Sequence, residues 1–184
     1  MPVRVALLRS MVIGQRRVSG ADVRALAAAA GGTEARSVIA TGNVVFRSRK
    51  ATATLTREME AACAAAFGRP TEIVVKTGEE WRALIAANPF PRETERAPSR
   101  VLAWVMRDPL PDEGLARLRA KASGVERVER TPQGDFYCWF GEGEIADSKL
   151  PSAFGLKTLG AVGTNRNWNT ATKITAVVDD LEGR

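Results

Sequence analysis

The chain of 184 residues contains no histidine and only two cysteines. Without histidine, a Ser-His-Asp triad, a Cys-His dyad and an imidazole-ligated metal site are all excluded. General acid–base work would fall to Asp, Glu, Lys, Tyr or Cys. A site made of carboxylates alone stays open, but no Asp-rich loop of the calcium-binding type occurs. We therefore predict no metal site and assign no cofactor.

The two cysteines and the absence of long apolar runs indicate the compartment. Cys63 falls in an alanine-rich helical stretch and Cys138 in an aromatic strand. Neither has a second cysteine at metal or redox spacing, which predicts buried thiols in a reducing cytoplasm, although pairing in space stays an alternative. No apolar run approaches the ~20 residues of a membrane span, and the first one, 3–8, is too short for a signal peptide. We expect a cytoplasmic protein without a membrane partner.

Positive charge is concentrated near the N-terminus. The formal net charge is +6, and residues 1–57 hold ten Lys or Arg against two acids, Asp22 and Glu34. A basic third of this kind attracts phosphate or nucleic acid. The alternative is a solvated basic surface without a ligand.

The order of the predicted elements gives the fold class. The first series contains strand 3–8, helix 21–30, strands 36–40 and 43–49, helix 52–67 and strand 72–76. The second series contains strand 101–106, helix 112–122, strands 125–130 and 135–140, a helix starting near Pro151 and a final helix at 169–181. The first order, βαββαβ, is the split-βαβ or ferredoxin-like arrangement, and the second repeats βαββα with a helix in place of the last strand. The sequence therefore predicts an α+β fold of two ferredoxin-like halves.

Three segments follow from this order. Residues 1–77 form the first half, and residues 100–184 form the second half with the C-terminal helix. Residues 78–99 hold a helix at 79–87, which the segment Asn88-Pro89-Phe90-Pro91 ends, and a polar linker or long loop at 92–99.

The segment 164–173, Thr-Asn-Arg-Asn-Trp-Asn-Thr-Ala-Thr-Lys, carries the densest chemistry. Arg166 and Lys173 supply charge, the amides supply donors and acceptors, and Trp168 supplies an apolar wall. Asn169 is the predicted N-cap of the final helix, whose positive end attracts anions. The alternative is structural: capping by Asn169, core packing by Trp168, and bonds from Arg166 to loop carbonyls.

Two residues outside this segment join the predicted site. Lys149, in a polar loop, would face the same cleft as Arg166. Asn43 follows Gly42 in a turn that a tight hairpin alone would also explain. The predicted ligand-binding set is Arg166, Asn167, Trp168, Asn169, Lys173, Lys149 and Asn43, and no catalytic residue is assigned.

The aromatic strand Phe136-Tyr137-Cys138-Trp139-Phe140 offers another possibility. Alternation places Tyr137 and Trp139 on one face, and Trp104 lies on a predicted neighbouring strand. Exposed rings on two such strands stack RNA bases, whereas buried rings only form a core.

Several short segments together resemble a known family. They are Ala6-Leu7-Leu8-Arg9, Thr41-Gly42-Asn43-Val44-Val45-Phe46, Asn88-Pro89-Phe90, Asp147-Ser148-Lys149-Leu150 and Arg166-Asn167-Trp168-Asn169-Thr170-Ala171-Thr172-Lys173. The chain resembles, over nearly its whole length, the uncharacterised bacterial family catalogued as domain of unknown function 1697. The resemblance implies an α+β fold and brings no established activity.

The chain departs from that family after its first strand. Members usually read Gly-Ile-Asn-Val-Gly-Gly there, whereas the matching positions here are Ser10-Met11-Val12-Ile13-Gly14-Gln15. If the loop binds an anion through backbone N–H groups in other members, this chain should do so less well.

Three functions stay open. The first is a binding module for a phosphorylated ligand or a nucleic acid, suggested by the basic N-terminal third and the amide-rich segment. The second is an enzyme that uses carboxylate, Lys or Tyr chemistry on a small molecule. The third is a structural or self-associating protein, in which case a homo-oligomer is expected.

Overall fold

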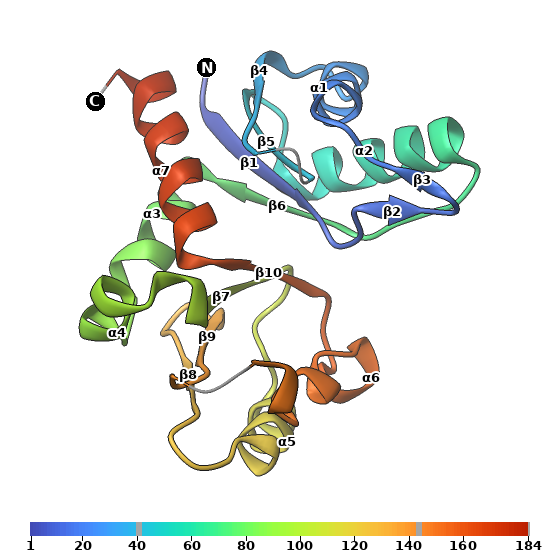
Figure 1. Ribbon diagram of the computed structural model, residues 1–184. Coiled ribbons are helices and arrows are strands. Elements are labelled where there is room, and N and C mark those ends of the chain that lie inside the picture. The colour runs from blue at the N-terminus through green and yellow to red at the C-terminus, as the bar shows by residue number, and fades with distance from the viewer. Residues whose placement is uncertain (40–41, 143–144, 184) are drawn as a thin grey trace. The chain divides into compact units, whose positions relative to one another are not determined.

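The computed structural model describes residues 1–39, 42–142 and 145–183. The chain is mixed α and β and divides into two compact units (Figure 1). Unit 1 comprises Met1–Ala83 and Thr172–Arg184, and unit 2 comprises Leu84–Ala171. The predicted boundaries at 77 and 100 differ from this division, in which the C-terminal helix begins in unit 2 and continues in unit 1.

The sheet of unit 1 is antiparallel, with the strand order β4-β5-β1-β6. Its elements are β1 Val3–Leu8, β2 Val12–Ile13, β3 Arg16–Arg17, α1 Gly20–Ala29, β4 Thr33–Ser37, β5 Asn43–Arg47, α2 Thr52–Phe67, β6 Ile73–Thr77 and α3 Gly78–Ala86. The predicted loop 9–18 contains the short hairpin β2–β3. The predicted strand 36–40 lies earlier, and its last residue, Ala40, lies outside the described residues, as does Thr41 of the predicted turn.

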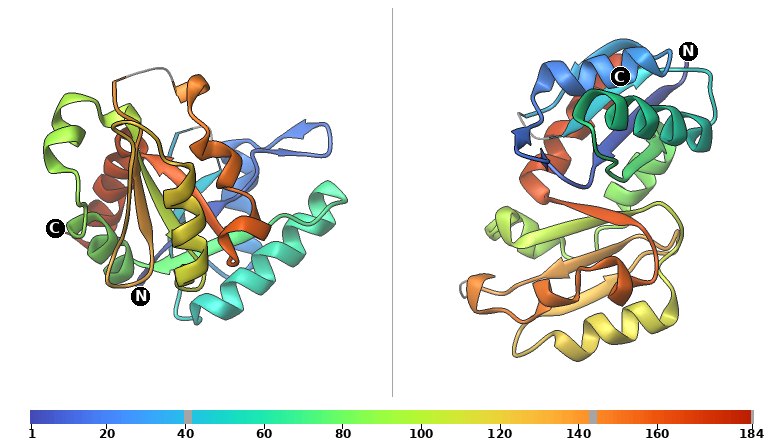
Figure 2. Two further views of the ribbon diagram at one scale, coloured as in Figure 1. Left: turned by 90° about the horizontal axis from the view of Figure 1, so that it is seen from below. Right: turned by 90° about the vertical axis from the view of Figure 1, so that its right-hand side faces the viewer.

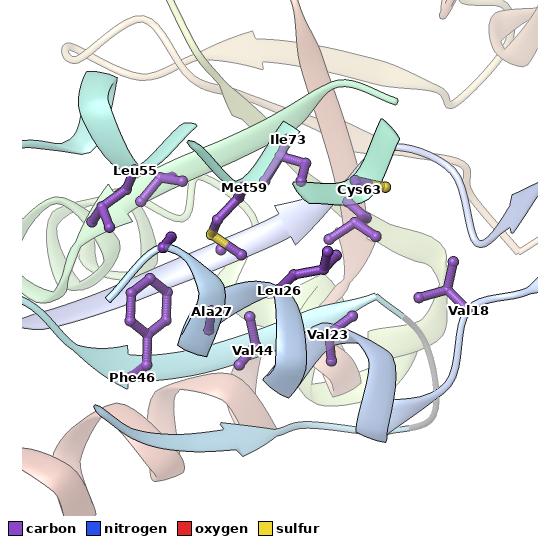
Figure 3. Packing of buried hydrophobic residues seen from close by; sticks show 14 of the residues in the cluster. Val18, Val23, Leu26, Ala27, Val44, Phe46, Leu55, Met59, Cys63 and Ile73 are labelled. Atoms are coloured by element: carbon purple, nitrogen blue, oxygen red, sulfur yellow. The ribbon is translucent and has the colours of Figure 1, made fainter. Parts of the chain in front are cut away.

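Two helices cover one face of this sheet. A capping box begins α1: Ser19 Oγ accepts from the N–H of Asp22, and the Asp22 carboxylate accepts from the N–H of Ser19. Gly68, in the left-handed conformation, ends α2. Figure 3 shows the resulting core, in which side chains of α1 and α2 pack against those of β5 and β6. Burial of this apolar surface holds the layer together.

The C-terminal part of α7, Trp168–Glu182, covers the other face of the unit 1 sheet. Ile174, Val178 and Leu181 are buried at helical spacing. The buried Trp81 of α3 donates from Nε1 to Thr175 Oγ1 at 3.0 Å. Arg47, whose side chain lies on this face of β5, donates to the Leu181 carbonyl. These contacts place the second part of the helix in unit 1.

Unit 2 has a second antiparallel sheet, with the order β10-β7-β9-β8. Its elements are α4 Pro91–Arg96, η1 Pro98–Arg100, β7 Val101–Met106, α5 Asp112–Lys121, β8 Arg127–Arg130, β9 Phe136–Trp139, η2 Ile145–Asp147, η3 Leu150–Ala153, α6 Leu156–Leu159 and β10 Gly163–Asn167. The right-hand view of Figure 2 shows α5, in yellow, along one side of this sheet. The core on that side contains Trp104, Leu118, Phe136 and Leu150.

Two expectations about unit 2 are wrong. The stretch 92–99, expected as a linker, contains most of α4 and the start of η1. The last strand, expected to be missing, is β10, which pairs with β7 from Gly163 to Asn167. Near Pro151, where a helix was expected to start, the structure has the short 3-10 turn η3, which begins at Leu150.

Among the described residues, no helix combines the length and the apolar character that crossing a bilayer requires.

Candidate functional site

The junction of β10 and α7 carries most of the predicted site residues. Asn167 ends the strand and Trp168 begins the helix. The Oδ1 atom of Asn167 accepts from the backbone N–H of Thr170 at 3.0 Å, which is the geometry of an N-cap. The cap is therefore Asn167, not Asn169 as expected. Asn169 lies exposed in the first turn of the helix.

Arg166 lies on the face of the unit 2 sheet opposite α5. Its register partner on β7 is Ala103, and Ala103 is paired with Tyr137 on β9, so the three side chains share one face. The Arg166 Nη1 atom donates to Thr164 Oγ1 at 2.9 Å and to the Asn165 carbonyl at 2.6 Å. These bonds fix the guanidinium close to its own strand. Thr164 was not part of the predicted ligand-binding set. Its position two residues before Arg166 on a strand places the two side chains on the same face.

Burial acts directly on the charge of Arg166. The side chain is half-buried, and desolvation lowers the pKa of Arg166 to about 10. The guanidinium therefore keeps its positive charge at neutral pH but is poorly hydrated. A cation in this state gains more from an anion than a fully hydrated one does.

Trp168 and Tyr137 form the apolar part of this face. Their ring centroids lie 6.2 Å apart at 53°. Tyr137 is fully buried, and its hydroxyl donates to the Leu84 carbonyl at 2.8 Å. Burial raises the pKa of Tyr137, so its phenol stays protonated and serves as a structural donor.

Three of the predicted residues, Lys149, Asn43 and Lys173, belong to other elements than β10 and the first turn of α7. Lys149 is exposed and directly precedes Leu150, which packs in the core on the α5 side of the sheet, whereas Arg166 lies on the opposite side. Asn43 and Lys173 belong to unit 1. Asn43 is fully buried and donates from Nδ2 to the Val38 carbonyl at 3.0 Å, so part of its amide has a structural role.

The aromatic strand offers no exposed stacking platform in the described chain. Trp104 stacks on Phe136, with centroids 5.2 Å apart and planes 8° apart, on the face opposite Tyr137 and Trp139. Each of these four rings is at most 7% exposed. These four rings are therefore buried, and none of them exposes a face on which a base could stack.

Acidic partners already neutralise much of the basic N-terminal third. Among the described residues of unit 1, five of its ten cations form ion pairs: Arg9 with Glu72, Arg16 with Asp22, Arg36 with Asp180, Arg47 with Glu34, and Lys50 with Glu58. A sixth cation of this segment, Arg4, is buried, and its guanidinium donates a hydrogen bond to the Lys50 carbonyl. The count of positive residues in the sequence overstates the free positive surface of this segment.

The described part of the chain shows neither an exposed cysteine nor a cluster of metal-binding side chains. Cys63 and Cys138 are both free and buried, and burial raises the pKa of each thiol. No three His, Cys, Asp or Glu side chains among the described residues lie close enough together to hold a metal ion.

Comparison with known proteins identifies the fold and the family of the chain. One solved structure, described as "The structure of conserved bacterial protein SP0830 from Streptococcus pneumoniae", matches with a TM-score of 0.77 at 21% identity. The match covers 97% of this chain and 99% of that one, so the two proteins share the fold. No curated protein matches the chain. The family described as "Protein of unknown function (DUF1697)" matches residues 1–137, and the chain belongs to this family.

Proposed function

We propose that unit 2 binds a phosphorylated small molecule at the β10–α7 junction. The observation that carries the proposal is the half-buried, positively charged Arg166, two residues before Trp168, which begins a 15-residue helix. The positive end of a helix dipole and a guanidinium both favour phosphate. Trp168 supplies the apolar wall and Asn169 an exposed amide.

The burial of the aromatic side chains favours a small ligand over a nucleic acid. Single-stranded nucleic acids are held largely by stacking on exposed aromatic rings and by open basic grooves. In unit 2 the rings of Trp104, Tyr137 and Trp139 are buried, and in unit 1 many arginines are already paired. A compact phosphorylated ligand needs only one fixed cation and a few polar groups.

The strand orders support a further proposal about the fold. In each sheet, the first strand lies between the third and the fourth strands of its series, and the second strand lies at an edge. This is the order of a ferredoxin-like unit, and we propose that the chain is a duplication of it.

The class of ligand is tested by titrating the purified protein with inorganic phosphate, pyrophosphate and a short single-stranded RNA. We expect saturable binding of pyrophosphate with a Kd of about 1 mM or lower and weaker binding of RNA. RNA binding that is tighter and falls steeply with salt would instead favour a nucleic-acid module. The absence of binding by all three would refute the anion site.

A further inference from the structure

Unit 2 contains a cavity of about 530 Å³ beside the start of β8 and the end of β9. Its described lining residues lie in α4, in the turn before β8, on β8 and β9, and just after β9. None of them belongs to segment 164–173, so the cavity is separate from the proposed anion site. Its volume is within the range typical of small-molecule sites.

The apolar part of the cavity combines an indole with an exposed aliphatic side chain. Trp139 is 7% exposed and Val125 is 67% exposed. Gly141 has a φ of 74°, and a Cβ added there would lie 2.3 Å from a methyl carbon of Val125. Glycine at position 141 therefore leaves room for the Val125 side chain. Val125 and Trp139 together form an apolar wall that suits an apolar group of a ligand.

The inner charges of the cavity are fixed. Arg127 forms an ion pair with Glu93, and its guanidinium lies 4.9 Å from the centroid of the Phe90 ring. The Glu93 side chain is 22% exposed and the Arg127 side chain 48% exposed. Two contacts on one guanidinium, one of them a cation–π contact, make this pair a stable part of the wall.

The outer charges are held much less firmly. Arg96 and Glu142 form an ion pair at the rim, and their side chains are 74% and 72% exposed. An ion pair this exposed contributes little to stability. A ligand with one anionic and one cationic end can therefore replace it, with the anion on Arg96 and the cation on Glu142. Arg96 and Glu142 each keep an opposite charge beside them in that complex.

We propose that this cavity binds a zwitterion with an apolar side chain, either a free amino acid or a short peptide. The carboxylate of the ligand would pair with Arg96 and its ammonium group with Glu142. The apolar side chain would lie against Trp139 and Val125. Among the described residues, the charged side chains that line the cavity are Glu93, Arg96, Arg127 and Glu142, two of each sign, and this balance disfavours a ligand of net charge.

The test is calorimetric titration of the purified chain with L-phenylalanine, the dipeptide phenylalanyl-glycine and N-acetyl-phenylalanine amide. We expect saturable binding of at least one of the two zwitterions, and binding of the amide, which lacks both charges, weaker by about tenfold or more. Tighter binding of the dipeptide identifies a peptide as the source of the zwitterion, and tighter binding of phenylalanine identifies the free amino acid.

Variants at the rim separate recognition from folding. Arg96→Gln and Glu142→Gln should each weaken zwitterion binding about tenfold and leave the melting temperature nearly unchanged, because both side chains are exposed. The matched control is Arg117→Gln, which breaks the exposed pair of Arg117 with Glu113 on α5 and should leave binding unaltered. Equal affinity for the uncharged amide, no binding of either zwitterion, or equal losses in the control would overturn the proposal.

Discussion

Asn167 caps the helix that follows the candidate site, because its Oδ1 atom accepts the backbone N–H of Thr170 at 3.0 Å. This bond fixes the backbone where the polar strand β10 becomes a helix. It therefore determines where Arg166 and Trp168 lie relative to the first turn.

Asn167→Ala should lower the free energy of unfolding by about 1 kcal/mol, because the helix loses its N-cap. Asn167→Asp keeps an acceptor at the same position and should cost less than about 0.5 kcal/mol. Urea denaturation followed by circular dichroism measures both values. If alanine and aspartate destabilise the protein equally, the cap does not stabilise α7.

Thr175→Val should destabilise the protein by about 1–3 kcal/mol, because the buried Trp81 indole loses the acceptor of its N–H. The hydroxyl is retained in Thr175→Ser, which should cost clearly less. Thermal unfolding of the two variants compares them directly. A valine variant as stable as the serine variant would show that the bond contributes little to holding α7 in unit 1.

The capping box of α1 should make stability depend on acid pH. Hydrogen bonds from the backbone and side chain of Ser19, opposed by some desolvation and assisted by Arg16, lower the pKa of Asp22 below its ordinary value. The unfolded state therefore binds this proton first as the pH falls. Asp22 contributes its full stabilisation above its unfolded pKa of about 4, and that stabilisation is lost as the pH falls through the folded pKa.

Asp22→Asn removes this dependence. Its free energy of unfolding should be lower than that of the wild type at pH 7, and the two should converge as the pH falls toward about 2. Denaturation at a series of pH values checks this. A constant difference between the two proteins across that range would contradict the assignment.

The sequence predicted the elements with a clear apolar pattern. The strand 3–8 is present with those bounds because it is a nearly continuous apolar run, and the helix 52–67 because its apolar residues repeat at spacings of three to four. The edge strand Gly163–Asn167 was missed because four of its five residues are polar and its pairing with β7 is long-range. Helix 91–96 was missed for a related reason: a short polar segment gives no periodicity.

The site could be predicted only as a segment. Composition pointed to segment 164–173. The sequence could not show that Lys149 directly precedes a residue of the core on the α5 side of the sheet, whereas Arg166 lies on the opposite face. It also could not show that Tyr137 and Trp139 are buried, because burial depends on which elements cover a face. Asn169 and Asn167 were equally suitable caps by residue type, and only the end of β10 decides between them.

The most direct test of the anion site is calorimetric titration of pyrophosphate into the wild type, Arg166→Gln and Lys149→Gln. We predict that Arg166→Gln weakens binding at least about tenfold while lowering the free energy of unfolding by less than about 1 kcal/mol, since it also relieves a desolvated charge. Lys149→Gln, which alters an exposed lysine on the α5 side of the sheet, should bind like the wild type. Unchanged binding by Arg166→Gln, together with a loss of stability of about 3 kcal/mol, would show that Arg166 holds the fold and does not bind a ligand.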